Sequence, residues 1–218
     1  MTLPPDHKAR MLAALAKTPA PTRAQMDTRA RTAWAGAIAL SLLLFVASGF
    51  RLGTRPMTFI AVSAAGWAVL GVLALAFSFV LGRSMLGRDT RTLRFVLAGA
   101  PMALVWMLVC LQLWPAAGDG EAPGLAHVAC FVYSLFIASG PFAAMAWLRR
   151  GSDPVKPRLT LAAYGAAAGL LAGVLMDVHC AYANLEHVVI GHVLPVVGFV
   201  GVGWLLGERL LGVAAKPD

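Results

Sequence analysis

Six apolar stretches of about 20 residues each follow one another along this 218-residue chain, separated by short polar segments. A helix of that length crosses the hydrocarbon core of a bilayer. Charged residues make up only 13% of the chain and hydrophobic residues 59%, whereas soluble domains have about 25% and 45–50%. The sequence therefore predicts an all-α, polytopic membrane protein, a bundle of six transmembrane helices. The predicted spans cover residues 33–50, 57–81, 95–114, 125–148, 159–178 and 188–206.

The basic residues indicate which helix ends face the cytoplasm, because Lys and Arg stay on that side during insertion. With the N-terminus inside, the inner segments hold 16 of the 18 Lys and Arg residues, and the outer loops hold only Arg51 and Arg55. The inner segments are residues 1–32, 83–94, 149–158 and the tail 208–218. We therefore predict a bundle over residues 33–207 with both termini cytoplasmic. Topology accounts for the net charge of +8, so no direct nucleic-acid partner is expected.

Residues 1–32 form a predicted cytoplasmic head before the first span. Residues 6–17 fit a short amphipathic helix, which would be marginal in water without a partner. Thr22 is expected to cap a second helical turn that runs on into the membrane, with Gln25 as its capping-box partner. The head is expected to bind a partner protein or the anionic lipid surface. Its candidate partner-binding residues are Lys8, Arg10, Met11, Leu12, Leu15 and Arg23.

Small residues mark where two of the predicted helices approach each other. Gly165, Gly169 and Gly173 recur every fourth residue on the fifth predicted span. Gly203 and Gly207 repeat this spacing on the sixth span. Because glycine lets helix backbones come close together, we expect tight helix packing at these positions.

Residues 177–192 interrupt the apolar sequence with one cysteine, three histidines and two acids. Helix direction places His127 and Cys130, in the first outer turns of the fourth span, at the same outer end. All three cysteines and four of the five histidines thus lie in the outer part of the predicted bundle. The candidate residues of this outer end are Cys130, Cys180, His127, His179, His187, His192, Asp177 and Glu186.

The residues leave three interpretations of this outer group open. Cys130 and Cys180 can be a redox pair, provided that their Cα atoms lie about 4.4–6.8 Å apart. The two thiols and some of the histidines can instead bind zinc or a similar ion, since Cys and His suit a tetrahedral site. In the third interpretation the group is structural, because cysteine is often simply buried. Cys110, in the apolar third span, is expected only to pack.

Asp177 and Glu186 bracket the outer loop, where we expect them to anchor the loop or to hydrogen-bond His179 or His187. Intramembrane acids often mark transport paths, and the interiors of the six predicted spans contain none, which disfavours a transporter. No Walker, zincin or nucleophile-elbow motif appears, and a haem site has no sequence signature. The chain is therefore not expected to be an enzyme.

Several features occur together in this order: a characteristic head, a cysteine early in the fourth span, a His-Cys pair closing the fifth, and a histidine and a proline in the sixth. Their positions are 12–24, Cys130, His179, Cys180, His192 and Pro195. With this layout the chain resembles, over nearly its whole length, the NrsF-type membrane anti-sigma factors of bacteria. A proline commonly follows the second cysteine in that family, whereas Ala181 stands here.

The resemblance implies that the head holds an extracytoplasmic-function sigma factor at the bacterial inner membrane and releases it under stress. It also implies that Cys130 and Cys180 are the sensor thiols for an extracytoplasmic redox or metal signal. The alternative is a small membrane redox, haem or metal-binding protein that uses the outward His/Cys group. A zinc-like ion at that group is the one cofactor that these residues suggest.

Overall fold

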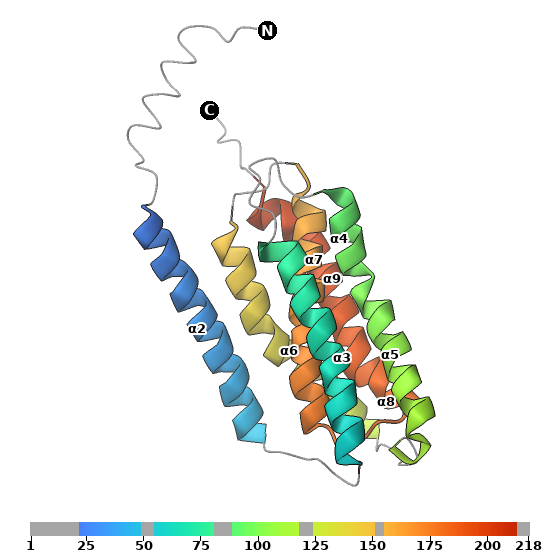
Figure 1. Cartoon of the computed structure of the whole chain (residues 1–218). Helices are drawn as coiled ribbons and strands as arrows, with labels where there is room; N and C mark the ends of the chain where they lie inside the picture. The colour runs from blue at the N-terminus through green and yellow to red at the C-terminus, as the bar shows by residue number, and fades with distance from the viewer. Residues whose placement is uncertain (1–21, 49–54, 81–88, 118–123, 151–154, 213–218) are drawn as a thin grey trace, which may run out of the picture.

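The computed structural model describes residues 22–48, 55–80, 89–117, 124–150 and 155–212. Within these ranges six helical segments are long and apolar enough to cross a membrane, as predicted, and they lie side by side in one bundle (Figure 1). The helices are α2 (Arg23–Ser48), α3 (Met57–Leu75), α4 (Thr90–Leu97), α5 (Gly99–Leu113), α6 (Gly124–Leu148), α7 (Pro157–His179), α8 (Leu185–Val188) and α9 (Leu194–Leu210). The shorter turns are π-helical at Ala76–Val80 and Val189–Val193 and 3-10 at Pro115–Ala117.

The first span begins where the predicted capping box lies. The side chain of Gln25 accepts a hydrogen bond from the Thr22 backbone N–H at 3.0 Å, and Thr22 Oγ1 accepts one from the Gln25 N–H at 3.3 Å. This reciprocal pair satisfies amide groups that a helix start leaves unpaired, so α2 begins at Arg23, ten residues before the predicted span. The other candidate partner-binding residues of the head lie outside the described residues.

Two other spans also begin at least three residues earlier than the sequence predicted. The carboxylate of Asp89 accepts hydrogen bonds from the first turn of α4, so the third span starts at Thr90 instead of residue 95. The side chain of Asn184 caps α8 in the same way, so the sixth span starts at Leu185 instead of residue 188. In both cases a polar N-cap residue lets the helix begin before the first residues of its apolar stretch.

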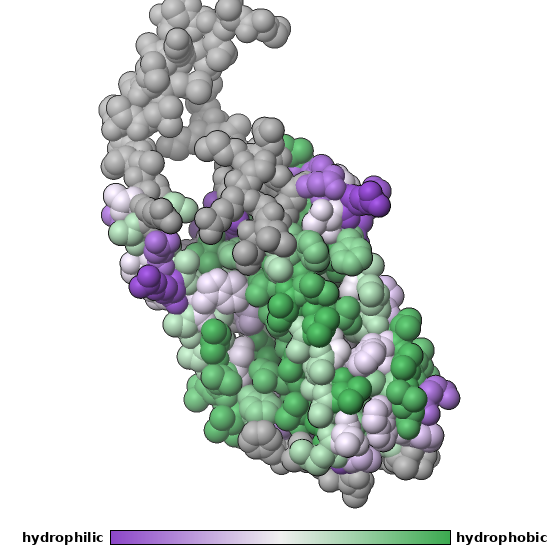
Figure 2. Space-filling model, in the orientation of Figure 1, coloured by the Kyte–Doolittle hydropathy of each residue, from purple (hydrophilic) through white to green (hydrophobic). Residues whose placement is uncertain are grey.

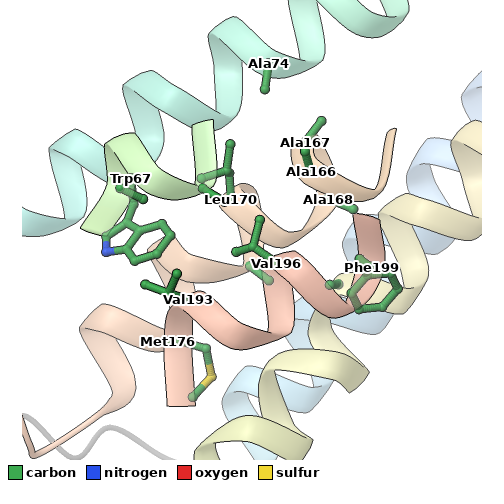
Figure 3. Packing of buried hydrophobic residues seen from close by; sticks show 14 of the residues in the cluster. Trp67, Ala74, Ala166, Ala167, Ala168, Leu170, Met176, Val193, Val196 and Phe199 are labelled. Carbon is green, nitrogen blue, oxygen red and sulfur yellow. The ribbon is translucent and has the colours of Figure 1, made fainter. Parts of the chain in front are cut away.

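α7 lies at the centre of the bundle and is the most buried of the six spans, whereas α2 is the least buried. Figure 3 shows Leu170 of α7 packed close to Trp67 of α3 and to Val196 of α9. Leu170, Trp67 and Val196 have no exposed surface. Because α7 has few residues facing outward, its position is fixed by its neighbours on several sides.

Glycines bring α7 and α9 into backbone contact, as predicted. A Cβ atom added at Gly165 would overlap the carbonyl group of Phe199 on α9. A Cβ atom added at Gly203 would likewise overlap the carbonyl group of Leu161 on α7. Only residues without a side chain allow this approach, so the two helices form one closely packed pair.

The two ends of the bundle differ in chemistry. The start of α2, the end of α6, the start of α7 and the end of α9 lie at the same end (Figure 1). Arg149 and Arg150 directly follow α6, and Arg158 is the second residue of α7. We call this the basic end, and the opposite end, where α7 finishes, the cysteine end. Figure 2 shows hydrophobic residues over most of the bundle's length on the face in view, with hydrophilic residues gathered mostly toward the basic end.

Candidate functional site

Two cysteines from different helices meet at the cysteine end. Cys130 lies in the second turn of α6, and Cys180 directly follows the last residue of α7. Their sulfur atoms are 3.6 Å apart, and no disulfide bond joins them. A disulfide bond measures about 2.05 Å, so this is a reduced pair within hydrogen-bonding distance.

Two histidines of the sixth span converge on these thiols. His187 Nε2 lies 3.0 Å from Cys180 Sγ, and the ring of His192 lies 5.4 Å from that of His187, centroid to centroid. In a regular α-helix, residues five apart would differ by about 140° in direction. The π-helical turn at Val189–Val193 has more residues per turn, which places both rings on the same side.

Neighbouring side chains hold this turn in place. Asn184 Oδ1 accepts a hydrogen bond from the His187 N–H at 2.9 Å, and Ser134 Oγ donates one to the Gly191 carbonyl at 2.9 Å. A Cβ atom at Gly191 would lie 3.1 Å from the Cβ of Cys130. The absence of a side chain at Gly191 therefore lets the π turn approach the cysteine of α6.

We define the Cys/His cluster as Cys130, Cys180, His187 and His192, whose ligand atoms all lie within 4.8 Å of one another. Zinc bonds of about 2.3 Å to sulfur and 2.0–2.1 Å to nitrogen place tetrahedral ligand atoms about 3.3–3.8 Å apart. The observed sulfur–sulfur distance of 3.6 Å falls in that range. Two thiols and two imidazoles are a complete tetrahedral set, so these residues fit a zinc-like ion.

The ring nitrogens of the two histidines lack other partners. Among the described residues, neither nitrogen of His192 nor Nδ1 of His187 has a hydrogen bond, although both residues are fully buried. Buried polar atoms normally have a hydrogen-bond partner, so unpaired ring nitrogens at a site indicate that a ligand can bind there. A bound ion would give His192 a partner.

The surroundings of Cys180 favour its thiolate. The hydrogen bond with Cys130, together with the imidazoles of His187 and His192, lowers the pKa of the Cys180 thiol well below its ordinary value of 9.0. Burial acts in the opposite direction and is outweighed. The thiolate is the form that binds metals and reacts with oxidants.

The other predicted residues lie around the cluster and do not belong to it. His127 presents its ring edge-on to that of His187, with 5.1 Å between centroids. His179 is not one of the four cluster residues, and its ring stacks on that of Tyr133 with 5.4 Å between centroids. Glu186 is exposed, and Cys110 is buried in the hydrophobic core, where it was predicted to pack.

Asp177 differs from its prediction as a loop anchor or histidine partner. It has no exposed surface and lies 3.6 Å from the guanidinium of Arg55, measured from Oδ1 to Nη1. Its Oδ2 accepts a hydrogen bond of 2.5 Å from Ser63 Oγ on α3. These contacts join the end of α7 to α3. They also give the carboxylate partners at a depth where an unpaired charge would be costly.

A cavity of about 420 Å³ opens beside the two thiols. Its wall includes Ala47 of α2, Tyr133 of α6, His179 of α7 and both cysteines of the cluster. The thiols are therefore accessible to a small molecule or ion, although Cys180 itself is buried.

Sequence reasoning missed several residues that shape this site. Ser63 and Ser134 are unremarkable polar residues in apolar spans, and nothing in their neighbourhood signals their partners. Tyr133 carries a signal that could have been used: it follows Cys130 by three residues and therefore lies on the same face of the helix. Arg55 stands out as one of two basic residues in the outer loops.

Taken together, the fold and the cluster define a small polytopic membrane protein with a thiol-imidazole site at one end of its helices and basic residues at the other. The chain belongs to the NrsF family, described as "Negative regulator of sigma F", which matches residues 13–212. No curated protein and no solved structure matches the chain. Family membership makes it an anti-sigma factor, a regulator of transcription whose partner is a sigma factor.

Proposed function

We propose that the chain holds an extracytoplasmic-function sigma factor at the bacterial inner membrane and releases it when the Cys/His cluster binds a thiophilic metal ion. Residues 1–32 bind the sigma factor in the cytoplasm, with Met11, Leu12 and Leu15 as apolar anchors. The basic residues Lys8, Arg10 and Arg23 meet acidic surface on the partner or the lipid headgroups. Bound in this way, the sigma factor does not reach RNA polymerase.

The charge distribution supports this orientation. The segments that connect to the basic end carry 16 of the 18 Lys and Arg residues, which favours that end for the cytoplasm. Both termini then lie inside, and the Cys/His cluster faces the outside. The partner and the signal meet the protein on opposite sides of the membrane.

The convergence of His187 and His192 on the two thiols is the observation that favours a metal signal. A disulfide uses only the two sulfur atoms, whereas here two buried rings complete a four-ligand set. Metal uptake would replace the contact between Cys180 and His187 and draw Cys130 of α6 toward the sixth span. Cys130 and Cys180 are also close enough to be oxidised to a disulfide, which is the competing signal.

Sigma binding is tested by deleting part of the head. Removing residues 1–21 leaves the capping box of Thr22 and Gln25, and hence α2, intact. Because the deletion removes the proposed anchors, the cognate sigma factor should no longer co-purify with the truncated protein, which keeps all six helices. If the truncated protein still retained the sigma factor and repressed its promoter, the assignment of the head would be wrong.

The nature of the signal is tested with a sigma-dependent reporter in cells. Zn²⁺ or Cd²⁺ should activate the reporter in cells with the wild-type protein, and His192→Ala should abolish that response. Diamide, which oxidises dithiols without a metal, gives the competing arm. A diamide response that needs both cysteines but not His192, with no metal response, would favour the disulfide signal and contradict the metal signal.

A further inference from the structure

The outer end of α2 is attached to the bundle at two adjacent residues. The hydroxyl of Tyr133 on α6 donates a hydrogen bond to the backbone carbonyl of Leu44. The ring of Phe45 packs edge-on against the ring of His179 on α7, with 6.3 Å between centroids. Because α2 is the least buried span, the loss of either contact should weaken its attachment at this end.

Each of the two residues that contact α2 is a neighbour of one cysteine. Tyr133 follows Cys130 by three residues on α6, and His179 directly precedes Cys180. The rings of Tyr133 and His179 are stacked, with an interplanar angle of 29°. A change in the distance between the two cysteines therefore displaces two rings that touch both each other and α2.

We propose that Tyr133 and His179 couple the Cys/His cluster to α2, so that ligand uptake at the cluster loosens the attachment of α2. This inference rests on the proposed function, because it assigns the route by which that site acts on the head. The two sulfur atoms are already at the spacing of metal ligands, so binding draws Cys130 toward the histidines of the sixth span, and Tyr133 turns with its helix. The hydrogen bond to Leu44 then weakens, because such bonds depend steeply on distance and angle.

The remaining helices offer a poorer route to the head. α7 and α9 are in backbone contact through Gly165 and Gly203, where any sliding would bring main-chain atoms into collision. α2 is restrained less tightly in the part described: a Cβ atom at Gly140 of α6 would lie 3.2 Å from the Ala37 carbonyl oxygen of α2, a longer distance than at the α7–α9 contacts. One hydrogen bond, from Ser41 Oγ to the Ile137 carbonyl at 3.1 Å, also joins α2 to α6. With 26 residues at about 1.5 Å each, α2 is long enough to carry a displacement from Leu44 to the basic end.

The test uses the full-length protein in lipid nanodiscs, with two measurements on each variant. Cd²⁺ binding to the cluster is followed by the absorption of the thiolate–metal bonds. The position of α2 is followed by the distance between probes introduced through unnatural amino acids at Met26 on α2 and Trp147 on α6. Both positions are exposed, and both border one cavity of about 340 Å³ at the basic end.

Tyr133→Phe removes the hydroxyl and keeps the ring. It should leave Cd²⁺ affinity nearly unchanged and abolish most of the Cd²⁺-dependent change in probe distance seen in the wild type. Before Cd²⁺ is added, the detached population of α2 should rise about threefold, the effect of an average interhelical hydrogen bond in a membrane. Phe45→Ala, which removes the ring of α2 that packs against His179, should have the same result.

Val46→Ala is the matched control, because Val46 adjoins Phe45 but is 70% exposed on the outer surface of α2. It should behave as the wild type in both measurements. If Tyr133→Phe and Phe45→Ala bound Cd²⁺ and moved α2 as the wild type does, the coupling would be refuted while the metal site stood. If the wild type itself did not bind Cd²⁺, the proposed metal signal would be refuted, and with it the coupling that depends on metal binding.

Discussion

The guanidinium of Arg55 lies inside the bundle beside Asp177, where it donates a hydrogen bond of 2.6 Å to the Asp177 carbonyl and lies 3.6 Å from the carboxylate. Both side chains are almost completely buried. Arg55 also stands over the ring of Phe59, 5.7 Å from its centroid. This pair ties the segment before α3 to the last turn of α7, three residues before Cys180, and so supports the backbone that carries the thiol.

We predict that Arg55→Ala lowers the free energy of unfolding by about 3–5 kcal/mol, because it leaves the Asp177 carboxylate buried without its cation. Asp177→Ala should have a similar effect for the same reason. The double variant should be less destabilised than the sum of the two, since neither charge is then left unpaired. Reversible unfolding in mixed micelles provides the measurement.

The exposed ion pair between Arg158 and Glu208 serves as the control for this experiment. Its atoms are only 2.9 Å apart, but the two side chains are 50% and 61% exposed. Glu208→Ala should therefore change the unfolding free energy by no more than about 1 kcal/mol. Equal effects at the buried and the exposed pair would show that Arg55 and Asp177 do not support the fold as argued.

The packing of α7 against α9 yields a second prediction. A methyl group at Gly203 would collide with the main chain of Leu161, which cannot move aside as a flexible side chain can. We expect Gly203→Ala to destabilise the protein by about 1–3 kcal/mol. Gly201→Ala, two residues away on the same helix, meets nothing within 4 Å and should be neutral or slightly stabilising. Thermal unfolding of both variants in one detergent distinguishes the two positions, and a tolerated Gly203→Ala would contradict the close approach.

The sequence predicted what depends on composition and on helix period. Apolar length gave the six spans, and the spacing of glycines identified the α7–α9 contact. Reciprocal capping by Thr22 and Gln25 was also visible, because its partners lie three residues apart. Helix direction brought the cysteines of two distant spans to the same end. All of these features are local, or follow from the order of the spans.

The parts of the site that the sequence did not reveal depend on tertiary contacts. His192 joins the cluster only because a π turn changes the direction of its side chain, and no residue type in Val189–Val193 predicts such a turn. Arg55 contributes to the topology count as a loop charge, but its burial against Asp177 depends on how α3 meets α7. The choice of His187 and His192 over His127 and His179 likewise required the packed structure.

The Cys/His cluster makes a prediction about metal affinity. His192→Ala removes one of four ligands, so Co²⁺ or Cd²⁺ should bind at least about 10–100 times more weakly, a loss that even residues behind metal ligands can cause. His127→Ala is the matched control, since its ring touches His187 but supplies no ligand atom to the cluster. It should lose less affinity than His192→Ala, because His187 Nδ1 forms no hydrogen bond with another described residue, His127 included. Metal titrations of the purified protein, followed by Co²⁺ ligand-field absorption, compare the two. Equal losses of metal affinity in the two variants would contradict the assignment of His192, and not His127, as a ligand.

The thiol pair makes a prediction about pH. Because the pKa of Cys180 is lowered by Cys130 first and then by the two imidazoles, we predict that more of Cys180 than of an ordinary thiol is thiolate near neutral pH in the metal-free protein. A thiol with a pKa of 9.0 would react about ten times faster for each pH unit between pH 6 and 8, whereas the alkylation rate of Cys180 should rise less steeply with pH. Cys130→Ala removes the strongest of these partners, so the pKa should rise and the rate should become more dependent on pH. Mass spectrometry of the Cys180 peptide after timed exposure to iodoacetamide measures both rates, with Cys110→Ala as the background that removes the third thiol. A tenfold rise per pH unit at Cys180 with Cys130 present would show that the cluster does not stabilise the thiolate.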